Sequence, residues 1–315
     1  MIINLNNQQN PIVSLRELLS KVHATLYYTR HELKHPLGIY NTAHSTTLKN
    51  FSKTTKTLLR VIYERPFLAK TSKEGDRSLM GTLLTAQKEL LYGLMEYMDD
   101  CDNILLCFFP SKDARKKDPQ AKNYRKSTQE YRSHIGKVVN YLKHNQGRLL
   151  DITFYNERLA LPGYFIVGAT NEDTVGPVRL IHSGNNAFSF ARDLRYHLFH
   201  FYAVALHLQT TLSKIQGKDI TSFALEKEVL LDEESINIAS CISNLPSTFY
   251  PDELIKPIPN VMISHGLHAS DQDITLIYPD EAMEVNSVPH GMRIVTSHMG
   301  DGVTRSFELP YMNNK

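Results

Sequence analysis

The hydrophobic period of the chain changes near residue 148, and this change limits the fold more than any other feature. Before that point apolar residues recur every three or four positions, the pattern of amphipathic helices. After it, short apolar runs are separated by Pro, Gly and Asn, as in strands joined by turns. Helices followed by strands predict an α+β fold, with a helical domain over 1–148 and an α+β domain over 149–315.

The first domain is expected to be a helical bundle. Helices are predicted over 14–36, where Pro36 and Gly38 should end or kink the helix, and over 47–64, 79–98 and 124–145. The apolar run 104–109 fits either a strand or a buried helical turn, and the charged stretch 111–123 is expected to be a solvated loop. The helix over 124–145 should bury one stripe, made of Tyr124, Thr128, Tyr131, Ile135, Val138 and Leu142.

The second domain is expected to hold a small antiparallel sheet and a long helix. Two runs within 149–170 predict a hairpin that turns at Leu161-Pro162-Gly163, and 178–182 is a candidate third strand. Helices are predicted over 188–214 and 232–242. Further strand candidates lie at 261–264, 274–278, 292–296 and 303–309.

Composition narrows the class of protein. With 42% hydrophobic and 22% charged residues among 315, the chain can bury a sizeable core. No run approaches the roughly 18 apolar residues of a membrane span, so no membrane partner is expected. The three cysteines, Cys101, Cys107 and Cys241, have neither metal-type spacing nor the even number of a disulfide framework. With no visible secretion signal, these features predict a cytoplasmic protein.

Positive charge is concentrated in one segment. Residues 112–148 carry eleven Lys or Arg and three Asp or Glu, a net charge of +8, whereas the whole chain has only +2. This asymmetry predicts an anionic partner, RNA or DNA first. The residues expected to contact phosphate, sugar or base are Arg125, Arg132, Lys137, Asn140, Lys143, His144 and Arg148.

A second candidate site lies on the helix predicted over 188–214. One edge of this helix carries Asp193 and His197, preceded by Arg192, and it continues with His200 and His207. A carboxylate one turn from a histidine can fix its tautomer and raise its pKa, which suits acid–base chemistry. The alternative interpretation is that these histidines border an ordinary core helix.

The spacing Arg192-x4-His197 resembles the Arg-x4–6-His pattern of the HEPN superfamily, which comprises all-helical nucleotide-binding and ribonuclease domains. The resemblance implies a metal-independent ribonuclease of a bacterial defence or toxin type, acting as a homodimer and without a cofactor. Arg192 would stabilise the phosphate in the transition state, His197 would act as acid or base, and Asp193 would orient them. In this interpretation His197→Ala abolishes RNA cleavage and leaves the fold intact.

Other histidine-rich stretches carry weaker signals. His31-Glu32-Leu33-Lys34-His35-Pro36-Leu37 resembles the phospho-accepting box of sensor histidine kinases, but no ATP-binding boxes accompany it, so we interpret it as a helix edge. His265, His268, Asp271 and Asp273 could bind a divalent ion or simply form a loop. We expect no metal site. The functional alternative is a non-enzymatic sensor, adaptor or effector that binds a protein partner.

Overall fold

The computed structural model describes residues 1–5, 10–22, 26–68, 73–145, 147–155, 160–171, 174–182, 184–217, 233–265, 272–282, 293–295 and 306–311. About 62% of the described residues are helical and 17% lie in strands. The α+β class predicted from the sequence is therefore confirmed.

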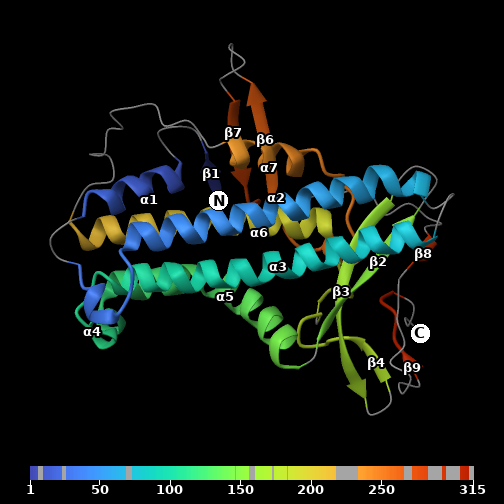
Figure 1. The fold of residues 1–315 in the computed structure, drawn as a ribbon, viewed down its shortest axis with the longest axis horizontal. Coiled ribbons are helices and arrows are strands. Elements are labelled where there is room, and N and C mark those ends of the chain that lie inside the picture. Colours follow the sequence, from blue (N-terminus) through green and yellow to red (C-terminus); the bar gives the residue numbers. More distant parts are fainter. Residues whose placement is uncertain are drawn as a thin grey trace.

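Long helices form one layer of the molecule and run in similar directions (Figure 1). The helices in the described residues are α1 (Pro11–Ser20), α2 (Pro36–Leu68), α3 (Lys73–Leu106), α4 (Lys112–Lys117), α5 (Pro119–His144), α6 (Phe190–Ile215) and α7 (Glu233–Ser243), with 3-10 turns at Thr29–His31 and Pro251–Glu253. α2 packs along α3, and α6 contacts α1, α3 and α5. The long helix of the second half is thus central to the helical layer.

Two sheets complete the fold. Their strands are β1 (Ile2–Asn4), β2 (Arg148–Tyr155), β3 (Ala160–Asn171), β4 (Thr174–Pro177), β5 (Phe188–Ser189), β6 (Asn260–His265), β7 (Gln272–Ile277), β8 (Arg293–Val295) and β9 (Ser306–Phe307). The larger sheet has the order β8-β2-β3-β4-β9, with β5 beside β3, and is mixed because β4 and β9 are parallel. The smaller sheet, β1-β7-β6, is antiparallel and pairs Ile2 with Ile277.

One hydrophobic core includes residues on both sides of residue 148. Phe201 of α6 is fully buried, and its ring centroid lies 4.6 Å from that of Tyr97 and 5.8 Å from that of Phe51. Apolar burial of this kind supplies most of the stability of a domain. The boundary near residue 148 stays a prediction.

The apolar stripe predicted for α5 is buried at every position. The segment 111–123, however, is not the expected loop, because α4 and the first turn of α5 occupy it. The Ser111 hydroxyl accepts a hydrogen bond from the Ala114 N–H (3.1 Å), and Asp118 Oδ1 accepts one from the Ala121 N–H (2.9 Å). These N-caps, with Pro119 in the first turn of α5, outweigh the polar composition.

The first predicted helix is wrong beyond Ser20, where α1 ends. Pro36 begins α2 instead of ending a helix, because the first turn needs no N–H from the proline. His35 Nδ1 accepts a hydrogen bond from the Leu37 N–H (3.2 Å), and Glu32 has a left-handed backbone with φ of 56°. The kinase-like box therefore forms a turn and a helix start, not a helix edge.

Two helices extend further than predicted. α2 continues through Pro66 to Leu68. α3 extends to Leu106, so the run 104–109 is the buried end of a helix and the turn that follows it, not a strand.

The predicted hairpin exists as β2 and β3, but Leu161-Pro162-Gly163 lies inside β3 and not at the turn. A Cβ at Gly163 would lie 2.1 Å from the Tyr250 hydroxyl oxygen, so glycine permits a close side-chain approach there. The strand predicted at 178–182 is also wrong. These residues form a turn in which His182 Nε2 accepts a hydrogen bond from the Ile166 N–H (2.9 Å).

Candidate anion-binding site

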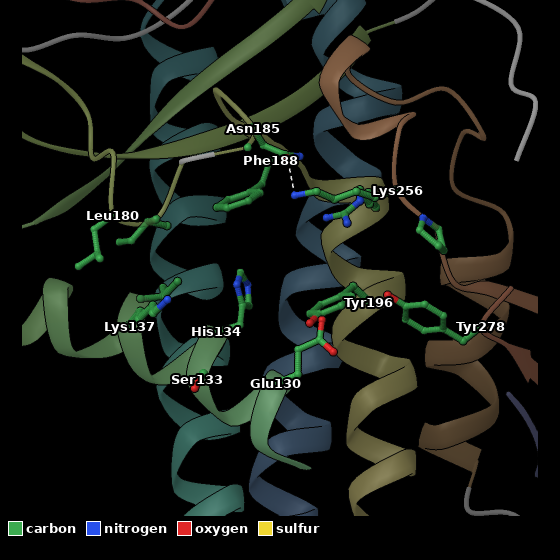
Figure 2. A pocket seen from close by; sticks show the side chains of 15 residues that line it. Glu130, Ser133, His134, Lys137, Leu180, Asn185, Phe188, Tyr196, Lys256 and Tyr278 are labelled. Atoms are coloured by element: carbon green, nitrogen blue, oxygen red, sulfur yellow. Dashed lines mark hydrogen bonds between the residues drawn. The ribbon is translucent and has the colours of Figure 1, made fainter. Parts of the chain in front are cut away.

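A cavity of about 480 Å³ lies between α5, the first turns of α6, the segment 180–188 and Lys256 (Figure 2). α5 contributes Glu130, Ser133, His134 and Lys137, and α6 contributes Arg192 and Tyr196. Asn185, Phe188, Lys256 and Tyr278 line the remaining walls. Four separate parts of the chain thus meet at one concave site, as is common for ligand pockets.

Positive charge dominates the cavity wall. Lys137, Arg192 and Lys256 supply three cations, and Glu130 is the only acidic side chain among the described lining residues. The Lys256 ammonium group donates a hydrogen bond to Asn185 Oδ1 (3.1 Å), a neutral acceptor. The cavity therefore keeps an excess of positive charge, which favours an anionic ligand.

Arg192 is the most constrained of these cations. It is 8% exposed, and its Nε is buried without a hydrogen-bond partner in the described part of the chain. Its guanidinium lies 5.7 Å from the centre of the Tyr196 ring. A buried charged donor without an acceptor costs free energy that a bound anion would recover.

The carboxylate of Glu253 acts on Arg192 through charge but is held by other groups. It accepts hydrogen bonds from the Ser189 N–H (2.9 Å), the Ser189 hydroxyl (2.6 Å) and the Tyr250 N–H (2.9 Å). Burial raises the pKa of Glu253 to about 7, although Arg192 and these hydrogen bonds act in the opposite direction. The hydrogen bonds of Glu253 are thus made to Ser189 and Tyr250, and its carboxylate acts on Arg192 through charge.

His134 supplies a neutral imidazole to the same cavity. Its ring is packed among Phe188, Tyr196 and His197, with ring centroids 6.1, 5.6 and 6.3 Å away. Burial, together with the charges of His197, Arg192 and Lys256, lowers the pKa of His134 to about 4, although Asp193 opposes this shift. A neutral imidazole can donate one hydrogen bond and accept another, so His134 offers both to a ligand in the cavity.

Behind the cavity wall lies a buried polar network centred on Asp193. Asp193 Oδ2 accepts hydrogen bonds from Gln87 Nε2 (2.7 Å) and the Tyr164 hydroxyl (2.7 Å), and it lies 3.3 Å from His197 Nε2. The Tyr131 hydroxyl is 3.1 Å from His197 Nδ1. Burial alone would raise the pKa of Asp193, but His197 and the hydrogen bonds hold it below its ordinary value. The network ties α3, α5, β3 and α6 together.

The three predicted catalytic residues lie in two layers. Arg192 lines the cavity, whereas Asp193 and His197 are 2% and 0% exposed. Arg192 and His197 are five positions apart, which separates their directions around a helix by about 140°. The described residue that brings an imidazole to Arg192 at the cavity is His134, and the catalytic assignment stays a prediction.

The predicted nucleic-acid contacts on α5 also divide into groups. Lys137 lines the cavity, and Asn140, Lys143 and His144 are exposed beyond it, as is Arg148 at the start of β2. The Lys143 ammonium group lies 5.1 Å from the centre of the Tyr92 ring. This part of the predicted surface is available to an anion.

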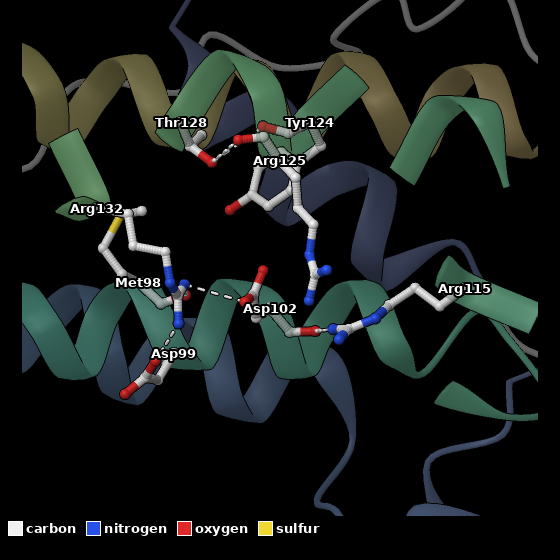
Figure 3. Close-up of polar contacts among 8 residues, drawn as sticks. All are labelled: Met98, Asp99, Asp102, Arg115, Tyr124, Arg125, Thr128 and Arg132. Carbon is white, nitrogen blue, oxygen red and sulfur yellow. Dashed lines mark hydrogen bonds and ion pairs between the residues drawn. The ribbon is translucent and has the colours of Figure 1, made fainter. Parts of the chain in front are cut away.

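Arg132 differs because acidic residues of α3 already bind it (Figure 3). Its guanidinium is 2.5 Å from Asp99 Oδ1 and 3.0 Å from Asp102 Oδ2. Arg125, which lies on the same helix, lines a separate recess. Arg132 thus connects α5 to α3, and its charge is largely compensated.

The other histidine candidates have structural contacts. His31 Nε2 is 2.8 Å from the Phe109 carbonyl oxygen, and the His200 ring stacks on Tyr131 with centroids 4.5 Å apart. His268 and Asp271, on which the alternative metal site depends, lie outside the described residues. Histidine, cysteine and acidic side chains in the described ranges form no group of three or more that could hold a metal ion.

Several cavity residues were missed by the sequence analysis. His134 precedes Lys137 by one helical turn, so helical spacing could have placed them together. Lys256 and Asn185 lie in irregular segments, and Tyr278 follows β7, where no periodic pattern links them to α5 or α6. Their contribution depends on the tertiary fold alone.

No helix in the described ranges is both long and apolar enough to cross a lipid bilayer. No protein-family model, curated protein or solved structure matches the chain.

Proposed function

We propose that this protein binds single-stranded nucleic acid, with one phosphate group held in the cavity by Arg192, Lys137 and Lys256. The observation that carries the proposal is the unpartnered, buried Nε of Arg192, with two lysines lining the same cavity. Phosphate oxygens accept hydrogen bonds from guanidinium and ammonium groups with favourable geometry.

Two further features favour a polymer over a small phosphorylated molecule. Lys137 lies on both the cavity wall and the exposed side of α5, where Asn140, Lys143 and His144 continue the polar surface. The cavity also contains Tyr196 and Tyr278, whose rings suit stacking against a base. Its volume of about 480 Å³ accommodates one nucleotide unit, which favours a single strand over a duplex.

Anisotropy of labelled 12-nucleotide RNA and DNA strands, measured at two salt concentrations, tests the proposal. Arg192→Gln should weaken binding by about tenfold to a hundredfold, since a hydrogen bond to a charged group contributes about 1.5–3 kcal/mol. Lys49→Gln, an exposed cation on α2, is the control and should bind like the unaltered protein. Equal affinity of both variants would refute the role of Arg192. No binding at low salt would refute the proposal and favour the protein-partner alternative.

Metal-independent RNA cleavage is the second function, and the observation that favours it is the presence of His134 and Arg192 in one cavity. The His134 imidazole would take the proton of a ribose 2′-hydroxyl, whose oxygen bonds to phosphorus. The P–O5′ bond would break, and the departing 5′ oxygen would take a proton from water. Arg192 would stabilise the phosphate charge, while Asp193 and His197 would position α6.

Gel analysis of RNA recovered from the binding assay tests this second function. We expect shortened RNA with the unaltered protein and full-length RNA with His134→Gln. Cleavage at the same rate in His134→Gln would exclude its role as the base. Binding without cleavage by the unaltered protein would leave a nucleic-acid-binding protein that is not a ribonuclease.

A further inference from the structure

A second cationic recess lies at the start of α5, whereas the cavity lies against the middle of this helix. It has a volume of about 270 Å³ and is enclosed by Leu105 of α3, by α4 and by the first turns of α5. Four cations line it, namely Arg115, Lys116, Lys122 and Arg125, and the described lining residues include no acidic side chain. The short helix α4 brings its basic residues back against those of α5.

Neighbouring groups compensate these charges only in part. Arg115 Nη1 donates a hydrogen bond to the Asp102 carbonyl oxygen (3.0 Å), but its Nε is buried without a hydrogen-bond partner in the described structure. The Asp102 carboxylate lies 3.0 Å from Arg132 Nη1 and so already forms an ion pair with a cation outside the recess (Figure 3). Burial lowers the pKa of Arg115, Asp102 opposes this effect, and the charges of Arg125 and Arg132 add to it. Like charges held together in this way favour a bound anion.

An exposed row of side chains joins the recess to the cavity. Arg125, Gln129, Ser133 and Lys137 are spaced by four residues, so they form one ridge along α5. Gln129 Nε2 donates a hydrogen bond to the Ser133 hydroxyl (3.1 Å), and neither carries a negative charge. From Arg125 to Lys137 the ridge covers about 18 Å at roughly 1.5 Å per residue.

We infer that the recess of Arg115, Lys116, Lys122 and Arg125 is a second phosphate subsite, which binds the same single strand about five nucleotides from the cavity. The inference rests on the proposed function of the cavity. The spacing follows from the length of the ridge, because stacked nucleotides advance by roughly 3.4 Å each. A strand of three nucleotides fills one subsite only, whereas one of twelve reaches both.

The test compares 3- and 12-nucleotide single strands on the full chain by fluorescence anisotropy. The recess variant is Lys122→Gln with Arg125→Gln, both exposed, and Arg115 is left in place because it binds the Asp102 carbonyl group. The control is Lys49→Gln with Lys56→Gln, which removes the same charge from exposed positions on α2.

The recess variant should bind the 12-mer more weakly and the 3-mer as the unaltered protein does. Each phosphate contact contributes about 0.7 to the salt slope of a single strand, so two lost contacts should lower it by about 1.4. When the salt concentration rises from about 50 to 200 mM, the ratio of the 12-mer affinity of the unaltered protein to that of the recess variant should therefore fall about sevenfold.

The possible failures have different signatures. A 12-mer affinity and salt slope equal to those of the control variant would overturn the second subsite and leave the cavity unaffected. Equal weakening of both strand lengths would overturn the spacing. If neither strand binds the unaltered protein at low salt, the proposed function fails and the second subsite fails with it.

Discussion

Replacing Asp193 by alanine should destabilise the protein strongly, because this buried carboxylate is the centre of a network that connects four structural elements. The change removes the acceptor of Gln87 Nε2 and of the Tyr164 hydroxyl, and it removes the negative charge beside His197. No water can replace the carboxylate easily, since Asp193 is 2% exposed and His197 is 0% exposed. Gln87, Tyr164 and His197 would then lose the carboxylate that they share, and Gln87 Nε2 would keep only its hydrogen bond to the Tyr164 hydroxyl (3.2 Å).

The expected loss is about 3–5 kcal/mol of unfolding free energy. A hydrogen bond to a charged group contributes about 1.5–3 kcal/mol, and removal of one partner of a buried pair typically costs about 3–5 kcal/mol. These contributions overlap because they involve the same oxygen, so they are not summed. Asp193→Asn keeps an acceptor and loses only the charge, so its loss should be smaller.

Urea unfolding at pH 7, followed by far-ultraviolet circular dichroism, measures this effect. Asp280→Ala is the control, because that carboxylate is fully exposed and its loss should change stability by less than about 0.5 kcal/mol. The pKa of Asp193 is lowered in the folded state, so its contribution is present above about pH 4 and is lost as the pH falls through the folded value. An Asp193→Ala midpoint equal to that of Asp280→Ala would refute the structural role of the network.

Three further measurements test other parts of the structure. Burial lowers the pKa of His200 to about 3, so the free energy of unfolding should fall as the pH drops below about 6.5. His200→Phe keeps a ring and should reduce this pH dependence, and an unchanged dependence would contradict the assignment. Gly136→Ala on α5 should stabilise the protein by about 0.5–1 kcal/mol because the added Cβ has no atom within contact distance. Gly163→Ala should destabilise it by about 1–3 kcal/mol, since the added Cβ clashes with Tyr250. Thermal unfolding that shifts in the same direction for both variants would refute this contrast. A bound anion should raise the low pKa of His134, so affinity for sulfate, whose charge is constant over this range, should increase as the pH falls from 7 to 5, and a flat calorimetric profile would argue against contact.

The buried positions of a helix are predicted best from the sequence where the opposite face of that helix is exposed to solvent. The buried stripe of α5 follows a regular period because its opposite face is exposed, so every stripe position is correct. α6 is different, since it is buried on most sides and its polar residues Arg192, Asp193 and His197 are all inside. Periodicity can indicate that such a helix exists, but it cannot tell which polar residue faces a cavity.

The errors in the first half have a common physical cause, which is local capping. The sequence pattern predicts Pro36 at the end of a helix and Pro119 in a loop, but each proline lies in the first turn of a helix, where its missing N–H is not needed. The failure to identify some cavity residues from the sequence has another cause. Lys256 reaches Arg192 and Lys137 only through the tertiary fold, which no local pattern contains.

The pairing of β1 with β7 has a consequence for synthesis on the ribosome. Leu5 donates its N–H to the Ile274 carbonyl oxygen (2.8 Å), and the Tyr278 N–H donates to the Met1 carbonyl oxygen (2.8 Å). β1 therefore waits for a partner strand that follows it in the chain, since Met1 and Tyr278 are 277 positions apart. Contacts between such distant segments form slowly because closing the long loop between them costs entropy. Tyr278 also lines the cavity. A nascent chain can therefore build its helical layer early, but it acquires a complete binding cavity only when the C-terminal strands emerge.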